Sequence, residues 1–142
     1  MSQLQQAGIE VARPERDRGV DLIAYLEFPQ FIACPIQLKV SSKSAFCVYR
    51  EKHRGMLLVY VWHVQDSSKT VALAMTWKEA EAIAQKMGWA AKPSYRKPKG
   101  YWRVPTVNMN SRKQSVRTLC SLLERYRMTP GDWLQAIRRA RD

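Results

Sequence analysis

The sequence predicts an α/β domain with a central β-sheet flanked by helices, followed by a basic helical extension at the C-terminal end. Apolar runs rich in β-branched and aromatic residues dominate the first half, whereas amphipathic patterns with helix caps dominate the second half. The chain has 142 residues, of which 46% are hydrophobic, so it is long enough to bury a core of its own. A single domain with a decorated C-terminal end is therefore the simplest organisation.

Two neighbouring strands are predicted at residues 20–27 and 31–40, most simply as a hairpin. Pro35 lies inside the second run and cannot donate to a sheet, which predicts an edge, a bulge or a strand start there. The run MLLVYVWHV at residues 56–64 is almost entirely apolar, β-branched or aromatic, and predicts a central strand covered on both faces. Shorter extended segments are expected at residues 9–14, 45–49 and 70–74.

Three helices are predicted after these strands. Thr76 and Glu79 have the spacing of a capping box, and Gly88 marks the end of that helix. A second helix fits residues 111–126, with Ser111 and Gln114 as a cap pair and Val116, Leu119, Cys120 and Leu123 facing inward. The last helix begins with the cap and first-turn proline of TPGD at residues 129–132, and its inward residues are Trp133, Leu134 and Ile137.

The charge of the chain is strongly basic and unevenly distributed. The formal net charge is +12 and the sequence pI is about 10.0. Residues 1–91 carry 11 basic and 9 acidic side chains, whereas residues 92–142 carry 13 basic and 3 acidic ones. This favours a polyanionic partner, with nucleic acid ahead of an acidic membrane surface. Residues 1–91 are thus expected to form the α/β core, and residues 92–142 a basic loop and two helices packed on it.

The segment KPSYRKPKGYWR at residues 92–103 is expected to be an exposed loop, because it contains two prolines and a glycine among basic and aromatic residues. Cations hold phosphates and ring faces stack on unpaired bases, which suits single-stranded or distorted nucleic acid. Alternatively, the aromatic residues anchor the loop to the core and only the charges are exposed. The candidate nucleic-acid-binding residues are Lys92, Arg96, Lys97, Lys99, Tyr101, Trp102 and Arg103.

Three polar residues mark the predicted hairpin. Asp21 opens the first strand after a glycine, while Gln37 and Lys39 lie two positions apart near the end of the second and so share a face. Mg²⁺ takes oxygen ligands, which Asp21, Gln37 and the Leu38 carbonyl can supply, and Lys39 can hold a phosphate oxygen. Alternatively, Asp21 is a turn residue and the Gln-x-Lys pair faces solvent.

The pattern GVD, with QLK sixteen positions later and VSS after it, resembles the PD-(D/E)xK nuclease superfamily, and within it the restriction-endonuclease-like domains related to Holliday-junction resolvases. The resemblance covers about residues 5 to 90. It implies a central mixed sheet flanked by helices and Mg²⁺- or Mn²⁺-dependent cleavage of phosphodiester bonds. By the same resemblance Asp21 is the metal ligand, Gln37 the second ligand and Lys39 the catalytic lysine. DNA is favoured over RNA, and relatives suggest a homodimer.

Two positions depart from the pattern of that superfamily. Gln37 replaces the usual acid, which removes a negative charge from the metal site. The first helix should carry a glutamate, but residues 2–6 contain no acid and Glu10 follows in an extended segment. Glu51 is a candidate replacement acid. The alternatives to a nuclease are therefore a non-catalytic nucleic-acid-binding or scaffold module with the same fold, and a protein-interaction subunit.

Cysteine usage and apolar runs indicate the compartment. The three cysteines, Cys34, Cys47 and Cys120, form no CxxC pair and are expected to be free, reduced and buried, as in a cytosolic protein. No apolar run approaches the ~18 residues of a membrane span, and the N-terminus has no signal-peptide pattern. The sequence therefore predicts a cytoplasmic location.

Overall fold

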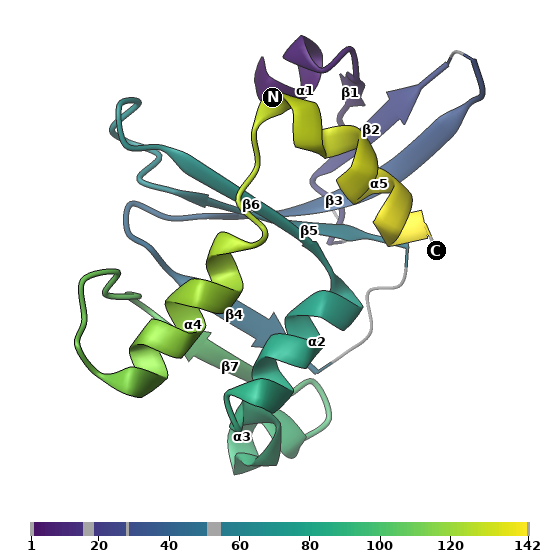
Figure 1. The fold of residues 1–142 in the computed structure, drawn as a ribbon. Coiled ribbons are helices and arrows are strands. Elements are labelled where there is room, and N and C mark those ends of the chain that lie inside the picture. Colours follow the sequence, from purple (N-terminus) through teal and green to yellow (C-terminus); the bar gives the residue numbers. More distant parts are fainter. Residues whose placement is uncertain (1, 16–18, 28, 51–54, 142) are drawn as a thin grey trace.

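The chain folds into a five-stranded mixed sheet, a two-stranded ribbon and several helices (Figure 1). The computed structural model describes residues 2–15, 19–27, 29–50 and 55–141. The elements are α1 Ser2–Gln6, β1 Glu10–Ala12, β2 Leu22–Leu26, β3 Ile32–Val40, β4 Phe46–Tyr49, β5 Leu57–Trp62, β6 Val71–Thr76, α2 Trp77–Lys86, the 3₁₀ turn η1 Trp89–Ala91, α3 Pro93–Arg96, β7 Tyr101–Val104, α4 Gln114–Glu124, the 3₁₀ turn η2 Pro130–Asp132 and α5 Trp133–Arg141. The predicted α/β class is confirmed.

The large sheet has the strand order β1-β2-β3-β5-β6. The predicted hairpin is confirmed, because β2 and β3 pair antiparallel from Leu22↔Ile36 to Leu26↔Ile32. β5 is central, as predicted, and its pairing with β3 is parallel while its pairing with β6 is antiparallel. Parallel strands require a crossover. Here the crossover runs through β4, which leaves the large sheet to pair with β7 in the two-stranded ribbon.

Pro35 lies inside β3 and pairs with Ile23 of β2, so the expectations of a strand start and of a bulge were wrong, whereas the expectation of an edge holds locally on the side away from β2. The reason is local. The Ile36 carbonyl accepts a hydrogen bond from Asp21 on the β2 side, so the neighbouring position 35 directs its backbone toward β5. The pairing between β3 and β5 begins only at Ile36↔Leu57. The missing N–H of Pro35 therefore falls just before that ladder starts.

The two faces of the large sheet pack against different layers (Figure 1). We call the face under α1 and α5 the helix face, and the face under the β4–β7 ribbon, α2 and α4 the ribbon face. Strand residues on the helix face are mostly aliphatic, and those on the ribbon face include the larger rings. The helix face buries Leu4, Leu22, Cys34, Ile36, Leu57, Val59, Trp133 and Ile137, and the ribbon face buries Phe46, Leu58, Tyr60, Trp62, Met75, Ile83, Trp89 and Leu123.

The helix caps were predicted with mixed success. In α2, Thr76 and Glu79 form the expected capping box, and Gly88 follows the helix with a φ of 77°. The prediction for α4 was wrong at its start, because the helix begins at Gln114 after Lys113 and has no side-chain cap. Ser111 instead accepts a hydrogen bond from the Lys113 N–H at 3.2 Å, which satisfies a turn outside the helix.

The last helix follows a capped 3₁₀ turn. The Thr129 N–H and hydroxyl donate to the Asp132 carboxylate at 2.8 and 2.7 Å, and these bonds hold the pKa of that carboxyl below its usual value. Trp133 and Ile137 are buried as predicted, whereas Leu134 is only half-buried. Before this turn, residues 126–128 hydrogen-bond to β6, so they cover the outer edge of the sheet.

Residues 92–103 are mostly exposed, as expected, but they do not form the expected loop. The segment contains the helical turn α3 and the start of β7, which pairs with β4 from Phe46↔Val104 to Tyr49↔Tyr101. Tyr95 is only 5% exposed and packs into the core on the ribbon face. The two prolines lie at the first position of α3 and in the turn after it, where neither interrupts a sheet.

The cysteines are free, and only Cys34 is buried, because Cys47 and Cys120 are half-exposed. The pKa of the Cys34 thiol is raised to about 11, chiefly by burial. Among the described residues, none of the helices has the length and apolar character needed to cross a bilayer.

Candidate metal and nucleic-acid site

Asp21 lies just before β2 and uses its carboxylate to extend the pairing with β3. Its N–H donates to the Ile36 carbonyl at 2.9 Å, and the Leu38 N–H donates to its Oδ2 at 2.7 Å. The Leu38 N–H would need a backbone carbonyl of β2 as its acceptor, but β2 starts only at Leu22. The Asp21 carboxylate accepts this hydrogen bond instead. Because the N–H and C=O of a strand residue point to the same side, the Leu38 carbonyl also faces the side on which Asp21 lies.

Gln37 lies on β3 next to the residue that Asp21 contacts. Its Oε1 is buried and has no hydrogen-bond partner among the described residues. An unsatisfied buried oxygen costs on the order of 1–3 kcal/mol, and such atoms commonly mark a place for a water or an ion. A carboxylate, a carboxamide oxygen and a backbone carbonyl are all ligands that Mg²⁺ accepts. The donor set therefore fits a divalent cation.

The structure brings no second acid to this corner from the N-terminal elements. Glu10 pairs with Tyr25, four residues along β2 from Asp21 and thus roughly 13 Å away. Helix α1 carries no acid and packs on the helix face through Leu4. Among the described residues there is no cluster of three His, Cys, Asp or Glu side chains. Glu51, the candidate replacement acid, lies outside the described residues.

Lys39 lies two residues beyond Gln37 on the same face of β3, roughly 7 Å further along the strand. Its Nζ is 4.8 Å from the centroid of the Tyr49 ring, a distance typical of a cation–π contact. The Tyr49 and Tyr101 rings have centroids 6.1 Å apart. The lysine therefore points away from β3 toward the β4–β7 ribbon.

A cavity of about 440 Å³ opens between the end of β3 and the ribbon. Two cations, Lys39 and Arg103, lie on its walls. Tyr60 closes it from the ribbon face of β5 and donates its hydroxyl to the Cys47 carbonyl at 2.6 Å. Burial raises the pKa of the Tyr60 phenol well above its ordinary value, so it stays protonated. The lining residues are Leu38, Lys39, Val40, Ser41, Ala45, Phe46, Cys47, Tyr49, Tyr60, Tyr101 and Arg103, without an acid among them.

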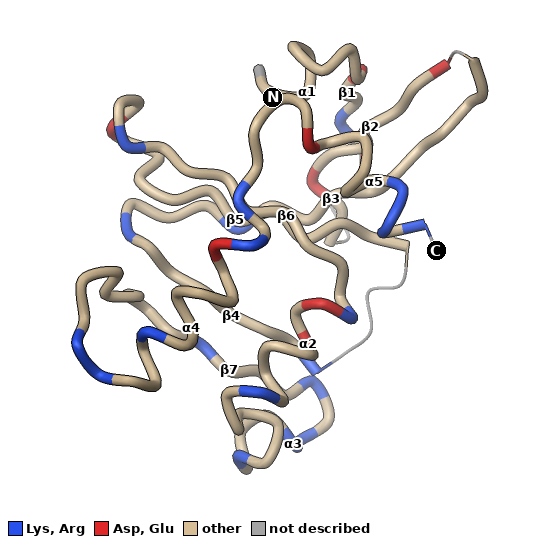
Figure 2. The backbone as a smooth tube through the Cα atoms, viewed as in Figure 1, with Lys and Arg blue, Asp and Glu red and all other residues tan. Residues whose placement is uncertain are grey.

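A second cavity, of about 430 Å³, adjoins the first along the ribbon. Tyr101 and Arg103 line both cavities, and Lys97 and Lys99 line only the second one. Figure 2 shows that basic positions gather around α3 and β7, where the backbone carries no acidic position from residue 92 to residue 104. The two adjoining cavities are thus lined by four cations and one exposed ring, namely Lys39, Arg103, Lys97, Lys99 and Tyr101.

The aromatic residues of this segment divide between anchoring and exposure. Tyr95 is buried, and its hydroxyl has no partner among the described residues. Trp102 is half-buried and stacks on Trp89 with centroids 6.2 Å apart. Tyr101 is 53% exposed. Of the three rings, one faces solvent, while Tyr95 and Trp102 hold the segment on the core.

The turn that carries Lys97 and Lys99 depends on a glycine. A Cβ on Gly100 would lie 2.1 Å from the Tyr95 carbonyl oxygen, so no larger residue fits without a shift of backbone. The Gly100 N–H donates to the Lys97 carbonyl at 2.8 Å, and Lys99 adopts a φ of 57°. The Arg50 N–H donates to the Gly100 carbonyl at 2.8 Å, and its guanidinium bonds the Arg96 carbonyl. Arg96 and Lys92 are exposed beside this turn.

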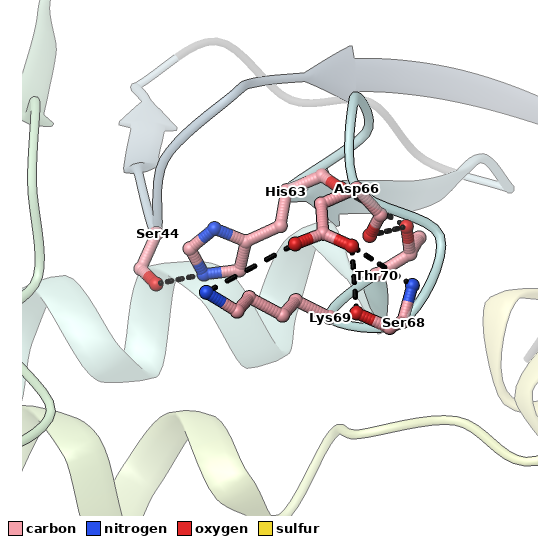
Figure 3. Close-up of polar contacts among 6 residues, drawn as sticks. All are labelled: Ser44, His63, Asp66, Ser68, Lys69 and Thr70. Carbon is pink, nitrogen blue, oxygen red and sulfur yellow. Dashed lines mark hydrogen bonds and ion pairs between the residues drawn. The ribbon is translucent and has the colours of Figure 1, made fainter.

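Figure 3 shows a polar cluster that the sequence did not indicate, formed by Ser44, His63, Asp66, Ser68, Lys69 and Thr70. The Ser44 hydroxyl lies 3.1 Å from the His63 Nε2, and Ser44 is only 7% exposed. The Asp66 carboxylate accepts hydrogen bonds from Ser68 within its own turn, and Lys69 lies 3.9 Å from it. The Asp66 N–H donates to the His63 carbonyl at 3.0 Å, but among the described residues no hydrogen bond joins the Asp66 carboxylate to the His63 ring, so these side chains do not form a Ser-His-Asp relay. The Ser44–His63 contact links the segment before β4 to the residue that follows β5.

Asp21 contacts the Leu38 backbone, and Gln37 lies opposite Asp21 when the Leu22↔Ile36 register is continued by one residue; Lys39 lines the first cavity. Of the predicted nucleic-acid-binding residues, Tyr101 and Arg103 reach the same cavity, and Lys97, Lys99 and Trp102 line the second. Comparison of the chain with protein-family models, with curated proteins and with solved structures finds no match.

Proposed function

We propose that this protein is a divalent-metal-dependent nuclease that cleaves phosphodiester bonds in nucleic acid, with DNA as the favoured substrate. One observation carries the proposal: the buried Gln37 Oε1 has no hydrogen-bond partner among the described residues, and it lies on β3 next to the residue whose N–H binds the Asp21 carboxylate. A purely structural glutamine at a buried position would be expected to find a partner. A cation at this corner would satisfy it.

The restriction-endonuclease-like form of the α/β fold is part of this proposal. Asp21 precedes a strand, Gln37 and Lys39 lie near the end of the antiparallel neighbour, and a parallel strand follows on the other side. This order agrees with the superfamily that the motif resembles. The strand order supports the restriction-endonuclease-like fold independently of how any one side chain is oriented.

The residues have distinct roles in the proposed reaction. Asp21, Gln37 and the Leu38 carbonyl would hold Mg²⁺ or Mn²⁺, which supplies Lewis-acid polarisation of a phosphoryl oxygen when it is bound. Lys39 binds a non-bridging phosphate oxygen and stabilises the charge that develops on it. Arg103, across the first cavity, holds a neighbouring phosphate. The tyrosine rings exclude water from one side of the substrate.

A second candidate is binding of nucleic acid without cleavage, and a specific observation favours it. One oxygen of Asp21 is already engaged by the Leu38 N–H, and Lys39 lies against the Tyr49 ring. A site with a single identified carboxylate binds Mg²⁺ more weakly than one with two. In this case the basic surface would bind nucleic acid while the corner of the sheet only stabilises the fold.

Cleavage assays separate the two candidates. Plasmid, branched DNA and single strands are incubated with the full chain and Mg²⁺ or Mn²⁺, and the variants are Asp21→Asn and Lys39→Ala. Asp21→Asn keeps an acceptor for the Leu38 N–H but loses the charge, so we expect an intact fold and loss of cleavage by about 10²-fold or more, as is typical for loss of a charge-stabilising group. Arg138→Ala, an exposed change on the far side of the sheet, is the control.

Metal binding is measured independently of cleavage. Mn²⁺ should raise the melting temperature of the wild-type chain and not that of Asp21→Asn. Cleavage that survives both Asp21→Asn and Lys39→Ala would exclude these residues from the reaction. Salt-sensitive binding with no cleavage under any of these conditions would establish the second candidate.

A further inference from the structure

From the two adjoining cavities we infer that the protein binds a single strand of nucleic acid, with an unpaired base on Tyr101 between two sets of phosphate-binding cations. The inference rests on the proposed function for the identity of the ligand, and it specifies the strand state of the substrate. Lys39 and Arg103 form one set, and Lys97 and Lys99 form the other.

The position of Tyr101 between the two cavities is the first step. Its ring lines both of them and is 53% exposed, and the Tyr49 ring supports it from the neighbouring strand. Tyr49 pairs directly with Tyr101 across the ribbon, so both rings lie on the same face. A ring face is available to a base only when that base is unstacked, which a continuous duplex does not allow.

The cations flank this ring on both sides. Arg103 is two residues from Tyr101 on the same face of β7, and Lys39 reaches the same cavity from β3. Lys97 and Lys99 line the second cavity, in the turn held by Gly100, and Arg103 lines this cavity as well. A strand that places its base on Tyr101 therefore has cations for the phosphates before and after that base.

The backbone at this place is fixed before any ligand arrives. Gly100 is packed on the Tyr95 carbonyl, and Arg50 bonds the backbone of the turn from β4. Trp102, the residue between Tyr101 and Arg103, is stacked on Trp89 in the core. This anchoring determines the direction in which Tyr101 and Arg103 project, because neighbours on a strand point to opposite faces.

The experiment measures binding of the full chain to a labelled oligo(dT) and to a duplex of the same length by fluorescence anisotropy. EDTA is present, so that neither metal binding nor cleavage is required. We expect the single strand to bind at least about tenfold more tightly than the duplex, and Tyr101→Ala to weaken single-strand binding by about tenfold while duplex binding is unchanged. Tyr101→Phe keeps the ring and should keep the affinity.

Two further variants test the cations and the specificity of the ring. Lys97→Ala and Lys99→Ala should each reduce the salt dependence of single-strand binding, log Kd against log salt, by about 0.7. Phe31→Ala removes an exposed ring at the far end of the hairpin, 63% exposed, and should have no effect. Circular dichroism confirms that each variant is folded.

Equal or tighter binding of the duplex would overturn the inference, as would a folded Tyr101→Ala variant that binds oligo(dT) like the wild type. The proposed function fails by a different result, because absence of metal-dependent cleavage leaves the binding measured in EDTA unaffected. A chain that cleaves duplex and binds it more tightly than single strands would keep the proposed function and exclude this inference.

Discussion

The two faces of strand β3 show how one strand serves both stability and the proposed site. Cys34 and Ile36 point to the helix face and are at most 1% exposed, whereas Gln37 and Lys39 point to the ribbon face and are half-buried. The first pair packs against a continuous aliphatic layer, and the second leads to a corner with an unsatisfied oxygen and to a cavity. Because side chains alternate between the two faces of β3, the polar residues of the proposed site lie within two residues of buried core residues without interrupting the core.

The sharpest test of this comparison truncates one residue on each face. Ile36→Ala should lower the free energy of unfolding by about 2–5 kcal/mol, because it opens a cavity in the buried layer. Lys39→Met retains the aliphatic stem and removes only the cation–π contact, so we expect a loss of about 0.5–1 kcal/mol. Urea denaturation measures both values. Similar losses at the two positions would contradict the division of roles.

A smaller effect is expected at the corner itself. Asp21→Ala leaves the Leu38 N–H without its acceptor and should lower the free energy of unfolding by about 1.5–3 kcal/mol. Asp21→Asn provides a neutral acceptor and should cost about half as much. The difference between the two variants in urea denaturation isolates the hydrogen bond from the charge. Equal losses would show that a neutral amide oxygen does not replace the carboxylate as the acceptor for the Leu38 N–H.

Gln37 should respond in the opposite direction. Without metal, Gln37→Leu removes a buried oxygen that lacks a partner and should raise the free energy of unfolding by about 1 kcal/mol. With Mn²⁺ at millimolar concentration the wild-type chain should gain stability and the variant should not. Thermal melts with and without the cation make this comparison. A variant that is less stable than the wild type in EDTA would mean that Gln37 has a partner in solution.

The last expected effect is a pH dependence from the helix face. Burial raises the pKa of Cys34 to about 11 from 9.0, so the folded state holds this proton more tightly than the unfolded state. The stability that this difference contributes is fully present below about pH 9 and is lost as the pH rises through 11. The melting temperature of the wild type should therefore fall more steeply across this range than that of Cys34→Ala. Parallel curves would contradict the assigned burial.

Local patterns in the sequence predicted much of the fold. The apolar run at residues 56–64 predicted the central strand, and the Thr76–Glu79 spacing predicted the start of α2, because both depend on neighbours a few residues away. The pair Gln37 and Lys39 was placed on one face for the same reason. Residues 92–103 were misjudged, because composition alone does not show that Tyr95 is buried or that β7 pairs with β4.

The sequence by itself determined that Asp21, Gln37 and Lys39 lie on neighbouring strands, since the alternation of side chains and the length of the turn between two apolar runs are local properties. Only the tertiary structure decided what surrounds them. The hydrogen bond from Leu38 to Asp21 and the meeting of Lys39 with Tyr49 and Arg103 each join residues at least ten positions apart. The lack of a described partner for Gln37 Oε1 is likewise visible only in the packed structure. The Leu38–Asp21 bond belongs to the pairing of β2 with β3, whereas the contacts of Lys39 depend on how the β4–β7 ribbon packs over the sheet, which no local pattern encodes.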